Sequence, residues 1–81
     1  MPKKQKRTEQ EVHTMIVKDS AMRLGCAGFA PIFTIHKIRP DQWANWDVRG
    51  VDPAGWLPDC AQAFKEAVER ARRKFDIAWP L

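Results

Sequence analysis

The sequence predicts a small α+β protein, a single domain with the order helix, strand, strand, helix. Apolar residues recur at helical spacing over residues 58–75, and the run "IFTIHKI" at 32–38 is rich in β-branched and aromatic residues. A length of 81 residues allows only one hydrophobic core. The hydrophobic fraction of 44% and the charged fraction of 30% are ordinary for a globular protein, so an entirely disordered chain is excluded.

The first seven residues, "MPKKQKR", have no apolar periodicity, and we expect them to form a flexible basic arm that precedes a domain over residues 8–81. The formal net charge is +4. Lys3, Lys4, Lys6 and Arg7 account for all of it, because basic and acidic residues balance from Thr8 onward. The net charge therefore describes the arm and gives little support to nucleic-acid binding by the whole domain.

A first helix is expected to begin at Thr8, because Thr8 and Glu11 have the spacing of a capping box. Val12, Met15 and Ile16 then give an apolar stripe, and Gly25 is placed to end the helix in a left-handed conformation. Residues 11–18, "EVHTMIVK", also alternate as a strand would. The sequence leaves this alternative open, although the cap favours the helix.

The segment 32–38 is predicted to pair with a second strand over 44–51 through the turn "RPDQ" at 39–42. Trp46 shares a face with Val48 and is the expected core residue, whereas Trp43 lies on the opposite, outward face. A two-stranded hairpin is marginal alone. We therefore expect a third short strand in residues 11–18 or 77–81, or a second copy of the chain at the edge.

The last helix is expected over residues 58–75. Pro58 and Asp59 suit its first turn, and cationic residues suit its last. Beyond it, Ile77, Trp79 and Leu81 either fold back on the core or stay exposed. The apolar stripe of this helix consists of Cys60, Phe64, Ala67, Val68, Ala71 and Phe75.

No catalytic signature is present, so we expect a protein that is not an enzyme and has no cofactor, metal or small-molecule substrate. The spacing of His13, His36, Cys26 and Cys60 matches no metal site. The chain has neither an apolar run long enough to cross a bilayer nor a signal-peptide core, which predicts a cytoplasmic location. In that compartment, the two cysteines are expected to be buried free thiols.

Two binding hypotheses follow from the remaining residues. The first is a protein-binding surface, used for a partner or for self-association as a homodimer, because tryptophans are frequent anchors of protein interfaces. Its residues are Trp43, Asn45, Asp47 and Trp56. The alternative is nucleic-acid binding through a basic arm and a basic helix end, with Trp43 or Trp56 stacking on bases. The basic residues are Lys3, Lys4, Lys6, Arg7, Arg70, Arg72, Arg73 and Lys74.

The order of two strands, a loop and the helical stretch "AFKEAVERA" resembles small strand–strand–helix modules. These include HicB-like antitoxin domains and the double-stranded-RNA-binding arrangement of helix, sheet and helix. The likeness implies a helix packed behind a hairpin. Pro58 and Asp59 stand where the RNA-binding arrangement needs lysines, and no site residue is carried over. The small size and the lack of catalytic groups suit an accessory regulator or inhibitor, of the sort that mobile genetic elements carry.

Overall fold

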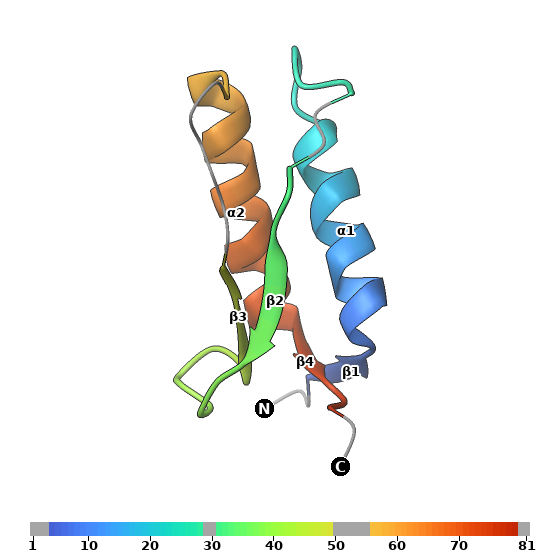
Figure 1. The fold of residues 1–81 in the computed structure, drawn as a ribbon, viewed down its shortest axis with the longest axis vertical. Helices are drawn as coiled ribbons and strands as arrows, with labels where there is room; N and C mark the ends of the chain where they lie inside the picture. Colours follow the sequence, from blue (N-terminus) through green and yellow to red (C-terminus); the bar gives the residue numbers. More distant parts are fainter. Residues whose placement is uncertain (1–3, 29–30, 50–55, 80–81) are drawn as a thin grey trace.

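A computed structural model describes residues 4–28, 31–49 and 56–79 and confirms a compact α+β domain. Figure 1 shows α1 and α2 running antiparallel side by side, with a hairpin of β2 and β3 on one face and the short strands β1 and β4 paired at one end. The elements are β1 (Gln5–Arg7), α1 (Glu9–Ala21), β2 (Thr34–Lys37), β3 (Trp46–Arg49), α2 (Pro58–Lys74) and β4 (Phe75–Ile77).

The capping box at the start of α1 is confirmed. The Thr8 hydroxyl accepts a hydrogen bond from the Glu11 amide, and the Glu11 carboxylate accepts one from the Thr8 amide. This local signal selects the helix over the strand for residues 11–18. The helix ends at Ala21, earlier than Gly25. Gly25 has a φ of +85° within a turn that the hydrogen bond from the Cys26 amide to the Arg23 carbonyl closes.

The hairpin is antiparallel, with a register from Thr34 opposite Arg49 to Lys37 opposite Trp46. Its two strands are shorter than the strands predicted over residues 32–38 and 44–51. Residues 50 and 51 lie outside the described part of the chain. The two tryptophans occupy the expected environments: Trp46 is 0% exposed and Trp43 is 40% exposed. The period-two rule therefore assigned the core tryptophan correctly.

The expectation of a flexible arm is wrong for residues 5–7, which form β1 in parallel register with β4. Ahead of it, the Lys4 ammonium donates a hydrogen bond to the Arg72 carbonyl at 2.7 Å. Strand β4 overlaps the third strand expected over 77–81, but it pairs with β1 and not with the hairpin. A pairing between segments about seventy residues apart leaves no periodic signal in either segment.

The core lies between the two helices and the inner face of the hairpin. Phe33, from the approach to β2, meets Phe64 of α2 edge to face at a centroid distance of 5.0 Å. The expected helix 58–75 is confirmed, with Pro58 in its first turn. The buried core residues are Val12, Ile16, Phe33, Ile35, Ala44, Trp46, Phe64, Ala67, Val68, Ala71 and Ile77.

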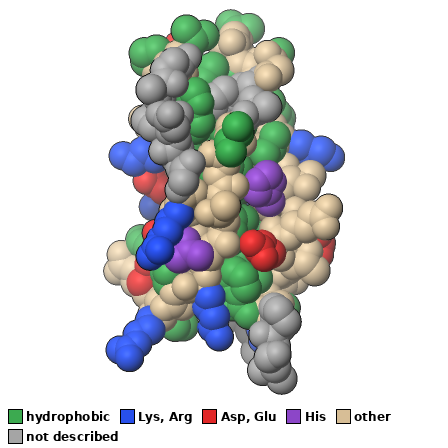
Figure 2. Space-filling model, viewed as in Figure 1, with side chains coloured by type: hydrophobic (Ala, Val, Ile, Leu, Met, Phe, Trp, Pro, Cys, Tyr) green, Lys and Arg blue, Asp and Glu red, His purple; other side chains and the backbone are tan. Residues whose placement is uncertain are grey.

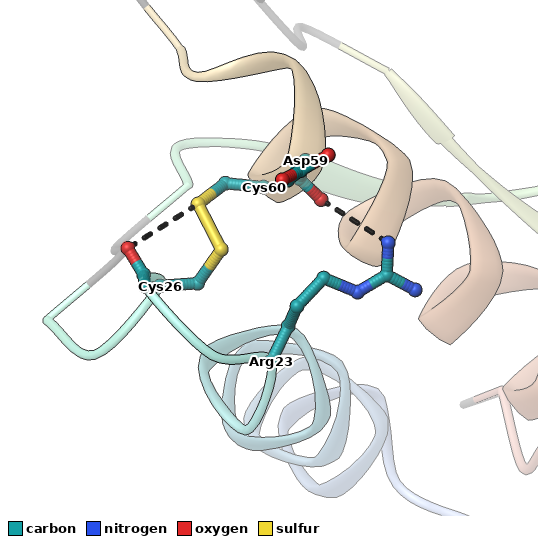
Figure 3. The surroundings of a disulfide bond; sticks show 5 residues. Arg23, Cys26, Asp59 and Cys60 are labelled. Carbon is teal, nitrogen blue, oxygen red and sulfur yellow. Dashed lines mark hydrogen bonds between the residues drawn. A yellow bond between two sulfur atoms is a disulfide. The ribbon is translucent and has the colours of Figure 1, made fainter.

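Cys26 and Cys60 form a disulfide, so the expectation of two free thiols is wrong. Their Cα atoms are 5.6 Å apart, which joins the turn after α1 to the first turn of α2 (Figure 3). Beside the bridge, the Arg23 guanidinium donates to the Asp59 carbonyl at 3.5 Å. The pairing depends on the antiparallel packing of the two helices, which brings together residues 34 positions apart.

Candidate protein-binding groove between β3 and α2

A groove with an apolar floor lies between β3 and α2. Its volume is about 380 Å³, near the lower end of the range of roughly 300–1,000 Å³ typical of ligand sites. Trp56, which precedes α2, meets Phe64 edge to face at 5.4 Å and so forms one wall together with the helix. The described lining residues are Asp47, Val48, Trp56, Ala61, Phe64, Lys65, Val68, Glu69 and Arg72.

Side chains bond two of the outward backbone groups of β3. The Asp47 carboxylate accepts the outward amide of Val48 at 2.8 Å. The Nε of Arg72 donates to the outward carbonyl of Trp46 at 3.0 Å. The Val48 amide and the Trp46 carbonyl are therefore already bonded within the chain, and at these two positions the groove offers side chains to a ligand.

The turn at one end of the groove is held by Asp41. Its carboxylate accepts the amides of Trp43 and Ala44, at 2.7 and 2.9 Å, and pairs with the Arg72 guanidinium. The hydrogen bonds from the Ala44 and Trp43 amides, and then the one from Arg72, lower the pKa of Asp41 to about 2. The same arginine thus connects this turn, the edge of β3 and the groove.

Trp43 lies beyond this end of the groove, with the Arg73 guanidinium over its ring at 4.6 Å. A smaller hollow of about 170 Å³ separates it from α2 and is lined by Trp43, Glu69, Arg72 and Arg73. Because Glu69 and Arg72 also line the main groove, the two hollows are adjacent. Trp43 and Trp56, the two tryptophans that the sequence analysis proposed for protein binding, therefore both lie beside the same face of α2.

Three of the four proposed protein-binding residues surround these hollows: Asp47 and Trp56 line the groove, and Trp43 lines the smaller hollow. Asn45 has a different position. Its side-chain amide exchanges two hydrogen bonds with the backbone of Ile77, each 3.0 Å long. Asn45 therefore links the hairpin to β4 and does not line either hollow.

Most of the proposed nucleic-acid-binding cations contact other parts of the chain. Lys4 pairs with Asp76 at 3.5 Å, and Arg70 pairs with Asp19 at 2.9 Å. Arg7 lies over the Phe75 ring at 5.6 Å. Arg72 and Arg73 are engaged as described above, and Lys3 lies outside the described residues. Lys6 and Lys74 have no described side-chain partner.

Within residues 4–28, 31–49 and 56–79, no three His, Cys, Asp or Glu side chains are grouped as metal ligands would be. His13 stacks on Phe33 at 4.2 Å, and the Nδ1 atom of His36 is buried without a hydrogen-bond partner. No helix in the same described part combines the length and the hydropathy needed to span a bilayer.

Sequence reasoning missed the apolar floor of the groove as a surface feature. Phe64 and Val68 belong to the predicted stripe of the last helix and were expected only as core. Val48 was expected on the core face of the hairpin, and it is half-buried. The groove arises because β3 and α2 leave a gap between two apolar faces, and no periodicity in either element encodes such a gap.

Comparisons with known proteins found no matching family, no matching curated sequence and no matching solved structure.

Proposed function

We propose that this chain is a small non-catalytic binding protein that docks a segment of another protein in the groove between β3 and α2. The observation that carries the proposal is the groove itself, with Val48, Trp56 and Phe64 in its apolar lining and charged side chains at its rim. Exposed apolar hollows with a polar rim mark interaction sites on small soluble proteins. Trp56, and Trp43 beyond the end of the groove, supply the residue type that most often anchors protein interfaces.

The occupant that best fits is a short segment with one or two bulky apolar side chains flanked by polar residues. A volume of about 380 Å³ accommodates a few side chains. The rim carries both charge signs, with Lys65 on one turn of α2 and Glu69 on the next. A strongly charged polymer of one sign is therefore a poorer match than a mixed peptide.

Such binding suits an accessory regulator or inhibitor that acts by protein–protein contact. The proposal includes self-association, in which the bound partner is a second copy of the chain. The expected cytoplasmic location stays a prediction. The disulfide between Cys26 and Cys60 counts against it, because such bonds persist mainly in oxidising compartments.

The nucleic-acid alternative has less support. Arg70 and Arg72 would have to give up ion pairs with Asp19 and Asp41 to contact phosphates. One face of the Trp43 ring is covered by Arg73, which leaves less of it for stacking on a base. A salt titration of binding to random DNA and RNA tests this alternative, since phosphate contacts produce a steep salt dependence.

The protein-binding proposal is tested by selecting random twelve-residue peptides from a phage library on the immobilised protein. We expect selected peptides to carry bulky apolar residues. An Ala61→Phe substitution fills the groove and should weaken their binding by about tenfold or more, the loss expected when an apolar anchor is displaced. The matched control is Gln62→Phe, which adds the same ring at an exposed neighbour that does not line the groove.

Circular dichroism establishes that both variants fold. Peptides that bind both variants as tightly as the parent protein would contradict the groove as the site, and a library that yields no binder would contradict the function.

A further inference from the structure

The end of the molecule that carries the Cys26–Cys60 disulfide has almost no hydrophobic core of its own. In residues 21–28 and 56–60, all of which the structure describes, the two cysteines are the only buried residues. The large apolar side chains nearby are exposed, Leu24 to 96% and Leu57 to 63%. In Figure 2, hydrophobic side chains gather on the surface at this end, at the top of the view. The two segments are therefore held together mainly by the covalent bond.

The other described polar contacts between the turn after α1 and α2 are made by a single residue, Arg23. Its guanidinium pairs with Glu66 and donates to the Asp59 carbonyl at 3.5 Å. The side chains of Arg23 and Glu66 are both more than a third exposed, and an ion pair in such a setting contributes little to stability. Without the disulfide, the turn would be held to α2 only weakly.

The first turn of α2 also lacks a side-chain cap. Its N-cap residue is Leu57, which has no side-chain oxygen to accept the amides left free at the start of a helix. By contrast, the Thr8 hydroxyl caps α1. The Leu57 carbonyl accepts the amides of Cys60 and Ala61, both at 3.0 Å, so the first hydrogen bonds of α2 lie directly beside the bridge. Loss of the bridge should therefore allow this turn to unwind.

The same turn positions part of the lining of the groove. Trp56 and Ala61, which lie before and after Cys60 in the chain, both line the groove. Trp56 meets Phe64, one helical turn after Cys60, edge to face at 5.4 Å. This contact joins a residue ahead of α2 to the second turn of α2, so it depends on the helical turn between them. Unwinding of that turn would displace Trp56 and Ala61 and so remove part of the groove.

We propose that the Cys26–Cys60 disulfide is a redox switch for the groove: its reduction by a dithiol releases the first turn of α2 and weakens peptide binding. This inference rests on the proposed function, because it concerns the regulation of the same groove. A thiolate of the reductant attacks one sulfur of the bridge, which breaks the S–S bond and forms a mixed disulfide. The second thiol then attacks the reductant's sulfur in that mixed disulfide. The reductant leaves as a disulfide, and its two electrons and two protons remain on the two cysteine thiols.

A reductant can approach the bridge from outside. A hollow of about 250 Å³ lies against the disulfide, and its lining includes both cysteines together with Leu24 and Leu57. Because disulfides persist in oxidising compartments and are reduced in the cytosol, the groove would bind its partner in the first environment and release it in the second.

The first measurement needs no ligand. Amide relaxation of the isotopically labelled full chain is compared before and after the addition of dithiothreitol. We expect the order parameters of residues 59–61 to fall below about 0.6 on reduction, whereas Ile77, at the opposite end of the molecule in Figure 1, stays ordered. A first turn that stays ordered in the reduced chain would overturn the proposal. Loss of order at both ends would overturn it too, because reduction would then unfold the whole domain.

The second measurement uses peptides selected on the oxidised protein. We expect their binding to weaken tenfold or more on reduction, because only the fraction of molecules with an ordered first turn is competent to bind. A Cys26→Ser, Cys60→Ser double variant should bind as the reduced protein does, with or without dithiothreitol. Equal or tighter binding after reduction would overturn the switch and leave the proposed function standing. A library without a binder for the oxidised chain would contradict the proposed function, and with it this regulation.

A pair of leucine substitutions tests the link between the first turn and the groove. Leu57→Ser gives α2 the N-cap that it lacks. Leu24→Ser is the matched control, since it removes another exposed leucine from a position outside the helix. In the reduced protein, we expect Leu57→Ser to strengthen peptide binding by about fivefold and Leu24→Ser to leave it unchanged. Equal effects of the two substitutions would contradict the role of the first turn.

Discussion

The side chain of Asn45 and the backbone of Ile77 exchange two hydrogen bonds. The amide nitrogen donates to the Ile77 carbonyl and the amide oxygen accepts from the Ile77 amide, both at 3.0 Å. Asn45 thus bonds to β4 as a neighbouring strand would. Nearby, the indole nitrogens of Trp46 and Trp79 donate to the Phe75 and Asn45 carbonyls. Side chains therefore join the two small sheets, which have no strand in common.

Asn45→Ala should lower the free energy of unfolding by about 2–3 kcal/mol, because two backbone groups of Ile77 lose partners in a part-buried site. Urea denaturation followed by circular dichroism measures this change. Gln42→Ala, at an exposed position of the same turn, is the control and should stay within about 0.5 kcal/mol of the parent. Equal stability of the two variants would show that the link is energetically unimportant.

Deleting residues 1–7 should destabilise the domain by on the order of 2 kcal/mol, because β4 loses its strand partner and the Arg72 carbonyl loses its hydrogen bond from Lys4. Lys6→Ala removes an exposed charge and keeps β1, so it should have little effect. Thermal melts of both chains make the comparison. If the deletion left the melting temperature unchanged, β1 would contribute no net stability.

Reducing the Cys26–Cys60 disulfide should lower stability by about 4 kcal/mol, the chain-entropy estimate for a bridge between residues 34 positions apart. Melting with and without a reductant measures the loss. A Cys26→Ser, Cys60→Ser double variant should have the stability of the reduced protein, and adding the reductant should not change its melting. Two reactive thiols in denatured protein that was never reduced would contradict the bridge.

Asp41 should make the turn sensitive to acid. Hydrogen bonds from the Ala44 and Trp43 amides, and then from Arg72, lower its folded-state pKa from 3.8 to about 2. A lowered folded-state pKa means that its contribution to stability is present above about pH 4 and is lost as the pH falls toward 2. Asp41→Asn should remove that part of the pH dependence.

Urea denaturation between pH 2 and pH 5 gives the measurement. The pKa of Glu66 is also lowered, first by the Gln62 hydrogen bond, so a Glu66→Gln background separates the two carboxylates. Parallel stability curves for the parent and Asp41→Asn across this range would contradict the assignment.

The sequence alone determined the features that depend on neighbouring residues. Thr8 and Glu11 begin α1, the apolar stripe from Cys60 onward forms α2, and strand periodicity places Trp46 inside. Each is a local rule in which residues two to four positions apart share a face or a hydrogen bond.

Only the tertiary structure decided the rest. The β1–β4 pair, the Cys26–Cys60 bridge and the groove each join segments far apart in the chain. Asn45 is the clearest case. As a residue of the outward face it was assigned to a binding surface, yet its amide serves the backbone of Ile77, which is 32 residues away. The periodicity of a sequence predicts the face of the strand on which a side chain lies, whereas its contacts depend on how distant segments pack against that face.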